Sequence, residues 1–166
     1  MIIAFIIAIL TIVVDQLTKY FLYGKSFSLI GDFLWIESPE LNTGASFGIF
    51  KGNTLVLAII SIPMIALMIY FICSKKHYNS LFFKISVAFL LGGTIGNLID
   101  RLWLGGVRDF IYFKSINFAI FNFADIFINI GVYSIIIYMI IDLFKKDKKK
   151  KQSKKDDEIT QTKENA

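Results

Sequence analysis

Apolar residues dominate four long stretches of the chain, which are separated by segments richer in polar residues. The stretches cover about residues 2–22, 55–73, 81–102 and 118–143. Each has about 19 residues or more, and a helix of about 20 residues rises about 30 Å, the thickness of the hydrocarbon core of a bilayer. We therefore predict an all-α membrane protein with four transmembrane helices, the second of them kinked at Pro63.

The first stretch also has the length of a secretory signal peptide, which is the alternative to a permanent helix. A signal peptide begins with a basic segment and ends at a cleavage site of small residues, typically A-x-A. No Lys or Arg precedes the apolar run of residues 2–22, and no A-x-A sequence follows it. We therefore expect a permanent first helix.

Residues 23–53, between the first two spans, show a different periodicity. Apolar side chains alternate with polar ones around Phe27, Leu29, Phe33 and Trp35, a pattern typical of strands with one apolar face. We predict a small β-rich segment, a strand or hairpin, between helices 1 and 2. Its aromatic side chains suit the membrane surface.

The composition supports a membrane protein and concentrates the positive charge at one end. Apolar residues make up 55% of the chain and the mean hydropathy is +0.63, above the range of soluble domains. The net charge is +5, and residues 145–166 carry a surplus of four, with nine Lys against five Asp or Glu. A basic segment directly after a span is typical of contact with anionic membrane phospholipids, which we favour over nucleic-acid binding.

The charge pattern also predicts the domain organisation. Residues 1–144 form one membrane domain, and residues 145–166 form a polybasic tail. The tail is of low complexity and highly charged, so we expect disorder beyond about residue 150.

The lysines predict how the spans are oriented. The segment "SKKHY" at 74–78 and the tail are separated by two spans, so they lie on the same side of the membrane. The positive-inside rule makes that side cytoplasmic. Both termini are then cytoplasmic, and residues 23–53 and 103–117 face outward.

Polar residues within or beside the spans gather toward the predicted outer surface. They are Asp15 and Lys19 in the first span, Asn97, Asp100 and Arg101 in the third, Asn122, Asp125 and Asn129 in the fourth, and Asp109 in the connection before it. Spacings of three and four place each helical group near one helix face. Ionisable residues are costly in a membrane and indicate function by default. We predict one polar site, built from several segments.

Two spacings also predict contacts that shape the helices. Asp15 and Lys19 lie four residues apart, so they are expected to form an ion pair, with direct substrate contact as the alternative. Gly92 and Gly96 form a G-x-x-x-G pair, which favours close helix packing over dimerisation.

Several kinds of chemistry lack the residues they need. Cys73 and His77 are the only cysteine and histidine, so no internal disulfide and no metal-ligand spacing is available. A Ser-His-Asp triad would require His77, in the basic loop. The chain contains no P-loop, G-x-G-x-x-G or H-E-x-x-H motif. We predict no metal and no cofactor, which leaves chemistry by carboxylates and amides.

Two neighbouring carboxylates can perform acid–base catalysis. Like charges at short range cannot both ionise, so the pair shares one proton, and it can then activate water against an amide carbonyl. A proton-coupled transporter would use similar residues, but it predicts polar groups on both sides of the midplane and an internal repeat, and we find neither. A non-catalytic scaffold is the third interpretation.

Five motifs occur together along the chain, and the family resemblance rests on them. They are "DQLTKY" (15–20), "NTGASFG" (42–48), "GNLIDR" (96–101), "VRDFI" (107–111) and "FNFAD" (121–125). In this order, and with four spans, they resemble the lipoprotein signal peptidases, the type II signal peptidases of bacteria, over about residues 10–131.

The resemblance implies an activity and a location. It implies an aspartyl endopeptidase in the bacterial plasma membrane. We expect a monomer, which needs nothing extra for this activity. Its substrates would be prolipoproteins that already carry diacylglycerol on a cysteine, cut just before that cysteine.

The resemblance further implies roles for the motif residues. The family's catalytic pair corresponds to Asp109 and Asp125. The resemblance implies supporting roles for seven other residues. Asn42 and Gly44 would contact the substrate backbone, and Asn97 and Arg101 would bind or orient substrate. Asn122 would position Asp125, and Asp15 and Lys19 would brace the first helix. Asp100 is interpreted as structural support.

Three positions depart from the family pattern. Ser46 stands where a second small residue is common, and Ile126 replaces a common Ser after the second Asp. Arg108 replaces the Val that often precedes the first Asp. A cation there would lower the pKa of Asp109 if it pointed into the site, so we expect Arg108 to point to solvent or headgroups.

Overall fold

The computed structural model describes residues 1–44, 51–75 and 80–164, so His77 and Ser46 lie outside the described residues. Its helices are α1 (Ile2–Leu22), α2 (Thr54–Cys73), α3 (Leu81–Leu104) and α4 (Phe123–Glu164), and its strands are β1 (Phe27–Ile30), β2 (Leu34–Ile36) and β3 (Ile111–Phe113), followed by a short 3₁₀ helix, Lys114–Ile116. The four helices are long and apolar enough to cross a membrane. The predicted all-α membrane fold is confirmed.

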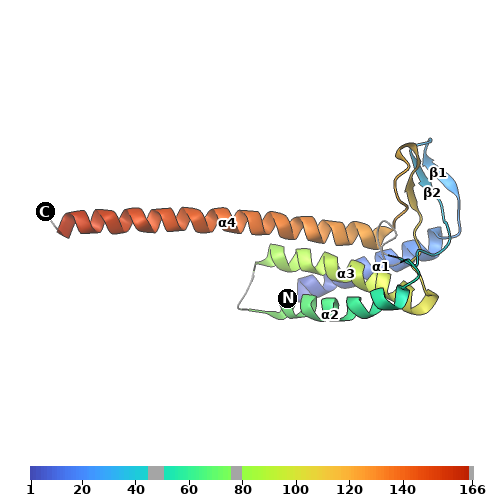
Figure 1. The fold of residues 1–166 in the computed structure, drawn as a ribbon, viewed down its shortest axis with the longest axis horizontal. Coiled ribbons are helices and arrows are strands. Elements are labelled where there is room, and N and C mark those ends of the chain that lie inside the picture. Colours follow the sequence, from blue (N-terminus) through green and yellow to red (C-terminus); the bar gives the residue numbers. More distant parts are fainter. Residues whose placement is uncertain (45–50, 76–79, 165–166) are drawn as a thin grey trace.

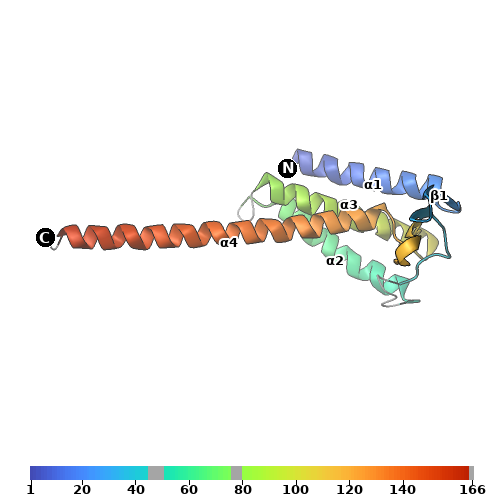
Figure 2. The same cartoon turned by 90° about the horizontal axis from the view of Figure 1, so that it is seen from above.

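Helix α3 is the centre of the bundle and packs against α1, α2 and α4 (Figures 1 and 2). Glycines allow this close approach. A Cβ atom at Gly92 would clash with Thr11, and one at Gly96 would clash with the carboxylate of Asp15, both on α1. A Cβ atom at Gly93 would likewise clash with the backbone carbonyl oxygen of Ala124 on α4. The predicted packing role of the glycine pair is confirmed, because small residues let helix backbones approach in a membrane.

The helices bury small and aliphatic side chains inward and expose large ones outward. Ala4 and Ala8 of α1 pack with Leu91 of α3 and Ile72 of α2 in one core cluster. Outward-facing Ile, Leu and Val side chains are widely exposed along all four helices, as Ile2 is at 73%. An apolar outer surface of this kind suits contact with lipid rather than with water.

A three-stranded antiparallel sheet stands at one end of the bundle (Figure 1). β1 and β2 form the hairpin expected in residues 23–53, with Ser28 opposite Trp35. The sequence analysis missed β3, which pairs Ile111 with Ile36 of β2. This strand has three residues, too few for a periodicity to be visible, and its pairing partner is distant in the sequence.

Helix α4 begins at Phe123 rather than near residue 118, because Asn122 caps it. The Asn122 Oδ1 atom accepts a hydrogen bond from the backbone N–H of Asp125 at 3.1 Å, and the Asn122 backbone N–H donates to Asp125 Oδ2 at 3.2 Å. This reciprocal arrangement is a capping box, with Asp in the usual Glu position. The cap fixes where the carboxylate of Asp125 lies.

Helix α4 then continues to Glu164, which differs from the disorder expected beyond residue 150. No Gly or Pro follows Gly131 before this end, and Lys, Gln and Glu are good helix formers. The helix extends far beyond the other three, away from the sheet (Figures 1 and 2). The N-terminus and the end of α4 both lie on the side of the bundle opposite the sheet (Figure 1). The domain boundary at residue 144 stays a prediction.

Candidate active site

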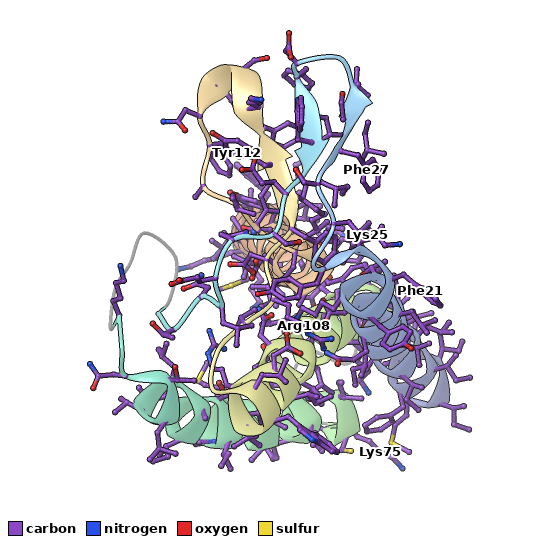
Figure 3. The ribbon with its side chains drawn as sticks, turned by 90° about the vertical axis from the view of Figure 1, so that its right-hand side faces the viewer. Phe21, Lys25, Phe27, Lys75, Arg108 and Tyr112 are labelled. Carbon is purple, nitrogen blue, oxygen red and sulfur yellow. The ribbon has the colours of Figure 1, made fainter. Side chains whose placement is uncertain are left out.

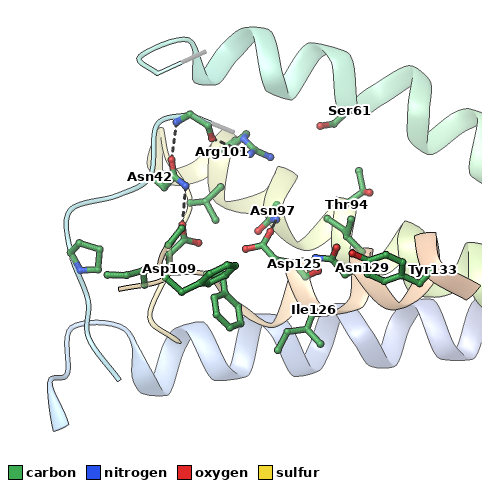
Figure 4. Close-up of a pocket in the computed structure, with 18 residues that line it drawn as sticks. Asn42, Ser61, Thr94, Asn97, Arg101, Asp109, Asp125, Ile126, Asn129 and Tyr133 are labelled. Atoms are coloured by element: carbon green, nitrogen blue, oxygen red, sulfur yellow. Dashed lines mark hydrogen bonds between the residues drawn. The ribbon is translucent and has the colours of Figure 1, made fainter. Parts of the chain in front are cut away.

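A cavity of about 910 Å³ opens between α2, α3 and α4 at the end that carries the sheet (Figure 4). Its polar lining includes Asn42, Gly44, Asn97, Arg101, Asp109 and Asp125. These residues come from the connections before α2 and before β3 and from helices α3 and α4, so several distant motifs meet in one place. The single polar site predicted from the sequence is therefore present in the fold.

Asp109 lies in the connection between α3 and β3 and is 5% exposed. Its Oδ2 atom accepts from Asn42 Nδ2 at 2.9 Å, and its Oδ1 atom accepts from Asn122 Nδ2 at 2.6 Å. Burial, followed by the nearby charge of Asp125, raises the pKa of Asp109 to about 6, although the two amide hydrogen bonds act in the opposite direction. Asp109 is therefore an acid that can hold a proton near neutral pH.

Asp125 lies in the first turn of α4 and faces the same cavity (Figure 4). Its Oδ1 atom accepts from Asn97 Nδ2 at 2.9 Å, and its Oδ2 atom accepts from the backbone N–H of Asn122. Asn122 thus bonds both carboxylates, Asp109 with its side chain and Asp125 with its backbone. One fully buried residue therefore holds the two acids in a fixed relation.

The amide of Asn97 is oriented by donors on the side away from Asp125. Its Oδ1 atom accepts from Lys19 Nζ at 2.9 Å and from Asn122 Nδ2 at 3.2 Å. Because only the oxygen of an amide can accept, these donors turn the Asn97 NH₂ group toward Asp125. Lys19 therefore contributes to the position of Asp125 through Asn97.

A buried ion network supports the site from behind. Lys19 Nζ lies 2.9 Å from Asp15 Oδ2 and 3.5 Å from Asp100 Oδ2, and all three side chains are 0% exposed. Asp15 Oδ1 also accepts from the backbone N–H of Ala124 at 2.9 Å, at the start of α4. The predicted ion pair of Asp15 and Lys19 is confirmed, and the network links α1, α3 and α4.

The expected orientation of Arg108 is wrong. Its guanidinium turns inward, with 17% of the side chain exposed, and lies 2.7 Å from Asp100 Oδ1 (Figure 3). Its backbone N–H also donates to Asp100 Oδ2 at 3.0 Å. A buried carboxylate without sufficient partners attracts a nearby cation more strongly than water does. Arg108 neither points to solvent nor bonds Asp109; it fastens the loop that carries Asp109 to α3.

Comparisons with known proteins identify the family of the chain. The sequence profile described as "Signal peptidase (SPase) II" matches residues 7–141. This chain belongs to the signal peptidase II family. A protein named "Lipoprotein signal peptidase" from Staphylococcus aureus is 39% identical over 154 residues, which cover 88% of this chain and 93% of the relative. The protein of that name from strain Newman is 38% identical over 151 residues, 87% and 91% of the two chains.

Solved structures show the same fold. One, described as a bacterial membrane enzyme structure at 2.3 Å resolution, superposes with a TM-score of 0.76 at 37% identity, over 84% of this chain and 88% of that one. A second, at 1.9 Å resolution, gives a TM-score of 0.71 at 38% identity, over 82% and 91%. The chain is therefore a membrane peptidase of the signal peptidase II family.

Arg101 of this signal peptidase II family member lies at the cavity, and part of its guanidinium has no hydrogen-bond partner among the described residues. It lines the cavity, and one terminal nitrogen, Nη2, lies 3.5 Å from the carbonyl oxygen of Gly44. Its buried Nε–H finds no hydrogen-bond partner among the described residues. Asn42 and Gly44 are joined by a 3.0 Å bond from the Gly44 N–H to Asn42 Oδ1. The guanidinium thus retains donor capacity beside the two acids.

The structure brings together all ten residues predicted for the site, in two layers. Asn42, Gly44, Asn97, Arg101, Asp109 and Asp125 line the cavity, whereas Asn122, Asp15, Lys19 and Asp100 lie behind it. Sequence reasoning missed Gln16, which donates to Asp15 at 3.1 Å and accepts from Arg108 at 3.0 Å. Its place inside the first motif was the available signal.

No group of three or more His, Cys, Asp or Glu side chains in the described part of the chain is arranged to hold a metal ion. The sequence analysis predicted from the residue types that the chemistry needs no metal. That stays a prediction, and an activity assay after metal removal can test it.

Proposed function

We propose that this chain is an aspartic endopeptidase that cuts diacylglyceryl-modified prolipoproteins just before the lipidated cysteine. Asp109 and Asp125 would activate the water. The observation that carries the proposal is the pair of carboxylates in one cavity, each bonded by Asn122. The names of the relatives supply the substrate class.

The chemistry follows from one proton shared by the two acids. The ionised carboxylate takes a proton from a water molecule, and the water oxygen attacks the scissile carbonyl carbon. The protonated carboxyl donates its proton to the carbonyl oxygen, which gives a neutral tetrahedral diol. This intermediate collapses when the C–N bond breaks. The leaving nitrogen receives the proton of the protonated acid, and one diol hydroxyl gives its proton to the ionised acid, which leaves a carboxylic acid product and restores the single proton of the pair.

The remaining cavity residues fit substrate positioning. Arg101 lines the cavity, so the terminal N–H groups of its guanidinium can donate to a substrate carbonyl near the acids. Asn42 holds Asp109 with its NH₂ group and the Gly44 N–H with its oxygen. We infer that this segment contacts the substrate backbone while it orients Asp109.

The proposed location is the bacterial plasma membrane, with the sheet and the cavity facing outward and both termini in the cytoplasm. The termini lie on the side of the bundle opposite the sheet (Figure 1). The lysines of the tail belong to the last part of α4, on that side, where they meet anionic phospholipid. A monomer contains all the groups that the proposed chemistry uses.

The proposal is tested by incubating the purified full chain in lipid vesicles with a prolipoprotein, with and without the diacylglyceryl group. We expect cleavage on the amino side of the lipidated cysteine, located by mass spectrometry, and little cleavage of the unlipidated form. EDTA should leave the rate unchanged. An inert wild-type enzyme would favour a non-catalytic family member, and loss of activity in EDTA would contradict the aspartic mechanism.

The pKa of Asp109 predicts a pH dependence. Cleavage requires one proton on the pair, so kcat/KM should fall as the pH rises far enough to remove it. Burial, which raises the pKa of Asp109 to about 6, should place this fall well above the range of an ordinary carboxyl group. Asn42→Ala removes a hydrogen bond that favours the ionised form. The alkaline limb should therefore move to higher pH in this variant, as measured by kcat/KM between pH 4 and about 9.

The matched control for this shift is Asn53→Ala, because that side chain makes no capping bond and does not line the cavity. Its profile should overlay that of the wild type. A limb that moves to lower pH in Asn42→Ala would contradict the assignment of the proton to this pair.

A further inference from the structure

Three polar side chains line the cavity on the side of the acids that faces away from the sheet. Ser61 of α2, Thr94 of α3 and Asn129 of α4 come from three different helices, and we call them the polar strip (Figure 4). Each lies in a stretch apolar enough to span a membrane. Polar groups at such a depth face a cavity or another protein group, and these three face the cavity, where a ligand can reach them.

The bonds within the helices determine what the polar strip offers. The hydroxyl of Ser61 donates to Leu57 O at 2.8 Å, and that of Thr94 donates to Leu90 O at 2.7 Å. The Asn129 NH₂ group donates to Asp125 O at 2.8 Å. No donor among the described residues bonds the three side-chain oxygens. The strip therefore presents mainly hydrogen-bond acceptors to the cavity.

Hydrogen-bond acceptors distinguish the diacylglyceryl group of a lipidated substrate from its peptide backbone. A diacylglyceryl group has ester carbonyls and a thioether, which accept hydrogen bonds but cannot donate them. A peptide in a helix uses its N–H groups internally, whereas an extended peptide leaves them free. The polar strip therefore matches the free N–H groups of extended peptide, not the lipid.

The length of the polar strip indicates which peptide residues it meets. Asn129 follows Asp125 by one helical turn, about 6 Å, and Thr94 precedes Asn97 by about 4.5 Å. An extended chain advances about 3.3 Å per residue. The strip therefore lies about two residues from the acids, and the cavity continues along α4 to Tyr133, about 12 Å or four residues away.

We propose that the polar strip binds backbone N–H groups of the signal peptide at the second to fourth residues before the cleaved bond. These residues would bind in an extended conformation. Cleavage requires the signal helix to unwind at the acids, and each N–H freed in hydrocarbon would otherwise lack a partner. The strip supplies acceptors for these groups. This inference rests on the proposed function and names the part of the substrate that the inner half of the cavity receives.

The test combines enzyme variants with substrate variants. The enzymes are Thr94→Val, Asn129→Leu and Ser61→Ala, with Ser134→Ala as the control, because Ser134 lies on α4 but does not line the cavity. The substrates are a lipidated prolipoprotein peptide and analogues in which the N–H of the second, third or fourth residue before the cysteine is replaced by an ester oxygen. Melting temperatures in detergent confirm that each enzyme is folded.

We expect each strip variant to raise KM for the amide substrate about 3- to 10-fold, with kcat within about twofold, as for the loss of one hydrogen bond. With at least one ester analogue, a strip variant and the wild type should have equal KM values, because the N–H that the strip binds is absent. Ser134→Ala should match the wild type throughout.

Two results would overturn the inference while the proposed function stands. One is a wild-type KM for the strip variants on the amide substrate. The other is a KM increase that persists with all three ester analogues, which would assign the strip to the lipid or to a side chain. Failure of the wild type to cut the amide substrate would instead overturn the proposed function, and this inference with it.

Discussion

Replacing either Asp109 or Asp125 by Asn is expected to lower kcat for prolipoprotein cleavage by about 10³- to 10⁴-fold, the scale of general acid–base catalysis. Asn is nearly isosteric with Asp, but it can neither take a proton from water nor share one with its partner. The amide oxygen of each variant can still accept one of the two hydrogen bonds that the carboxylate accepts, from Asn42 or from Asn97, whereas the bond from Asn122 is lost. The melting temperature of each variant therefore has to show that it is folded. Cleavage is measured in vesicles at saturating lipidated substrate.

The double variant separates a cooperating pair from two independent acids. If the carboxylates share one proton, the second substitution should add little to the first, because residues that act as a unit are not additive. Asp142→Asn is the matched control, since Asp142 is a partly exposed acid on α4 that pairs with Lys146, outside the cavity. It should keep wild-type activity.

Asp100 provides the decisive contrast for this prediction. It is completely buried and does not line the cavity, and its partners are Arg108, Lys19 and Gln16. Asp100→Asn should lower the melting temperature while the folded enzyme still cuts. If Asp109→Asn cuts well and Asp100→Asn does not, the proposed pair is wrong, and Asp100 becomes the candidate partner of Asp125.

The parts of the fold that the sequence predicted depend on local patterns. Hydropathy located the four helices because each span is a continuous apolar run, and the spacing of four residues predicted the pair of Asp15 and Lys19. The hairpin of β1 and β2 followed from the alternation around Trp35. These patterns act over a few residues, so they are visible without knowledge of the tertiary structure.

The features that were missed depend on contacts between distant segments. Strand β3 exists because Ile111 reaches Ile36 of the hairpin, and Arg108 turns inward because Asp100 lies behind it. The supporting part played by Lys19 also depends on α1 lying beside Asn97. Motifs identified the residues of the site, but only the packing of α1 and α4 on α3 shows which of them face the cavity.

The second large effect concerns stability. Lys19→Met should destabilise the folded protein by about 3–5 kcal/mol, because it leaves the carboxylate of Asp15 buried without its cation. For a chain of this length, such a loss corresponds to a fall in melting temperature of roughly 10 °C, measured by thermal unfolding in detergent. Activity should fall as well, since Asn97 loses the donor that turns its amide toward Asp125.

The chain contains a matched control for this prediction. Lys146 and Asp142 form an ion pair with the same spacing of four residues, but the lysine side chain is 72% exposed. Lys146→Met should cost at most about 1 kcal/mol, as solvated pairs do. In the double variant Asp15→Asn with Lys19→Met, part of the lost stability should return, because the introduced amide is neutral and its oxygen could still accept from the Ala124 N–H. Equal losses for the two lysine variants would show that burial of the Asp15–Lys19 pair does not determine its contribution.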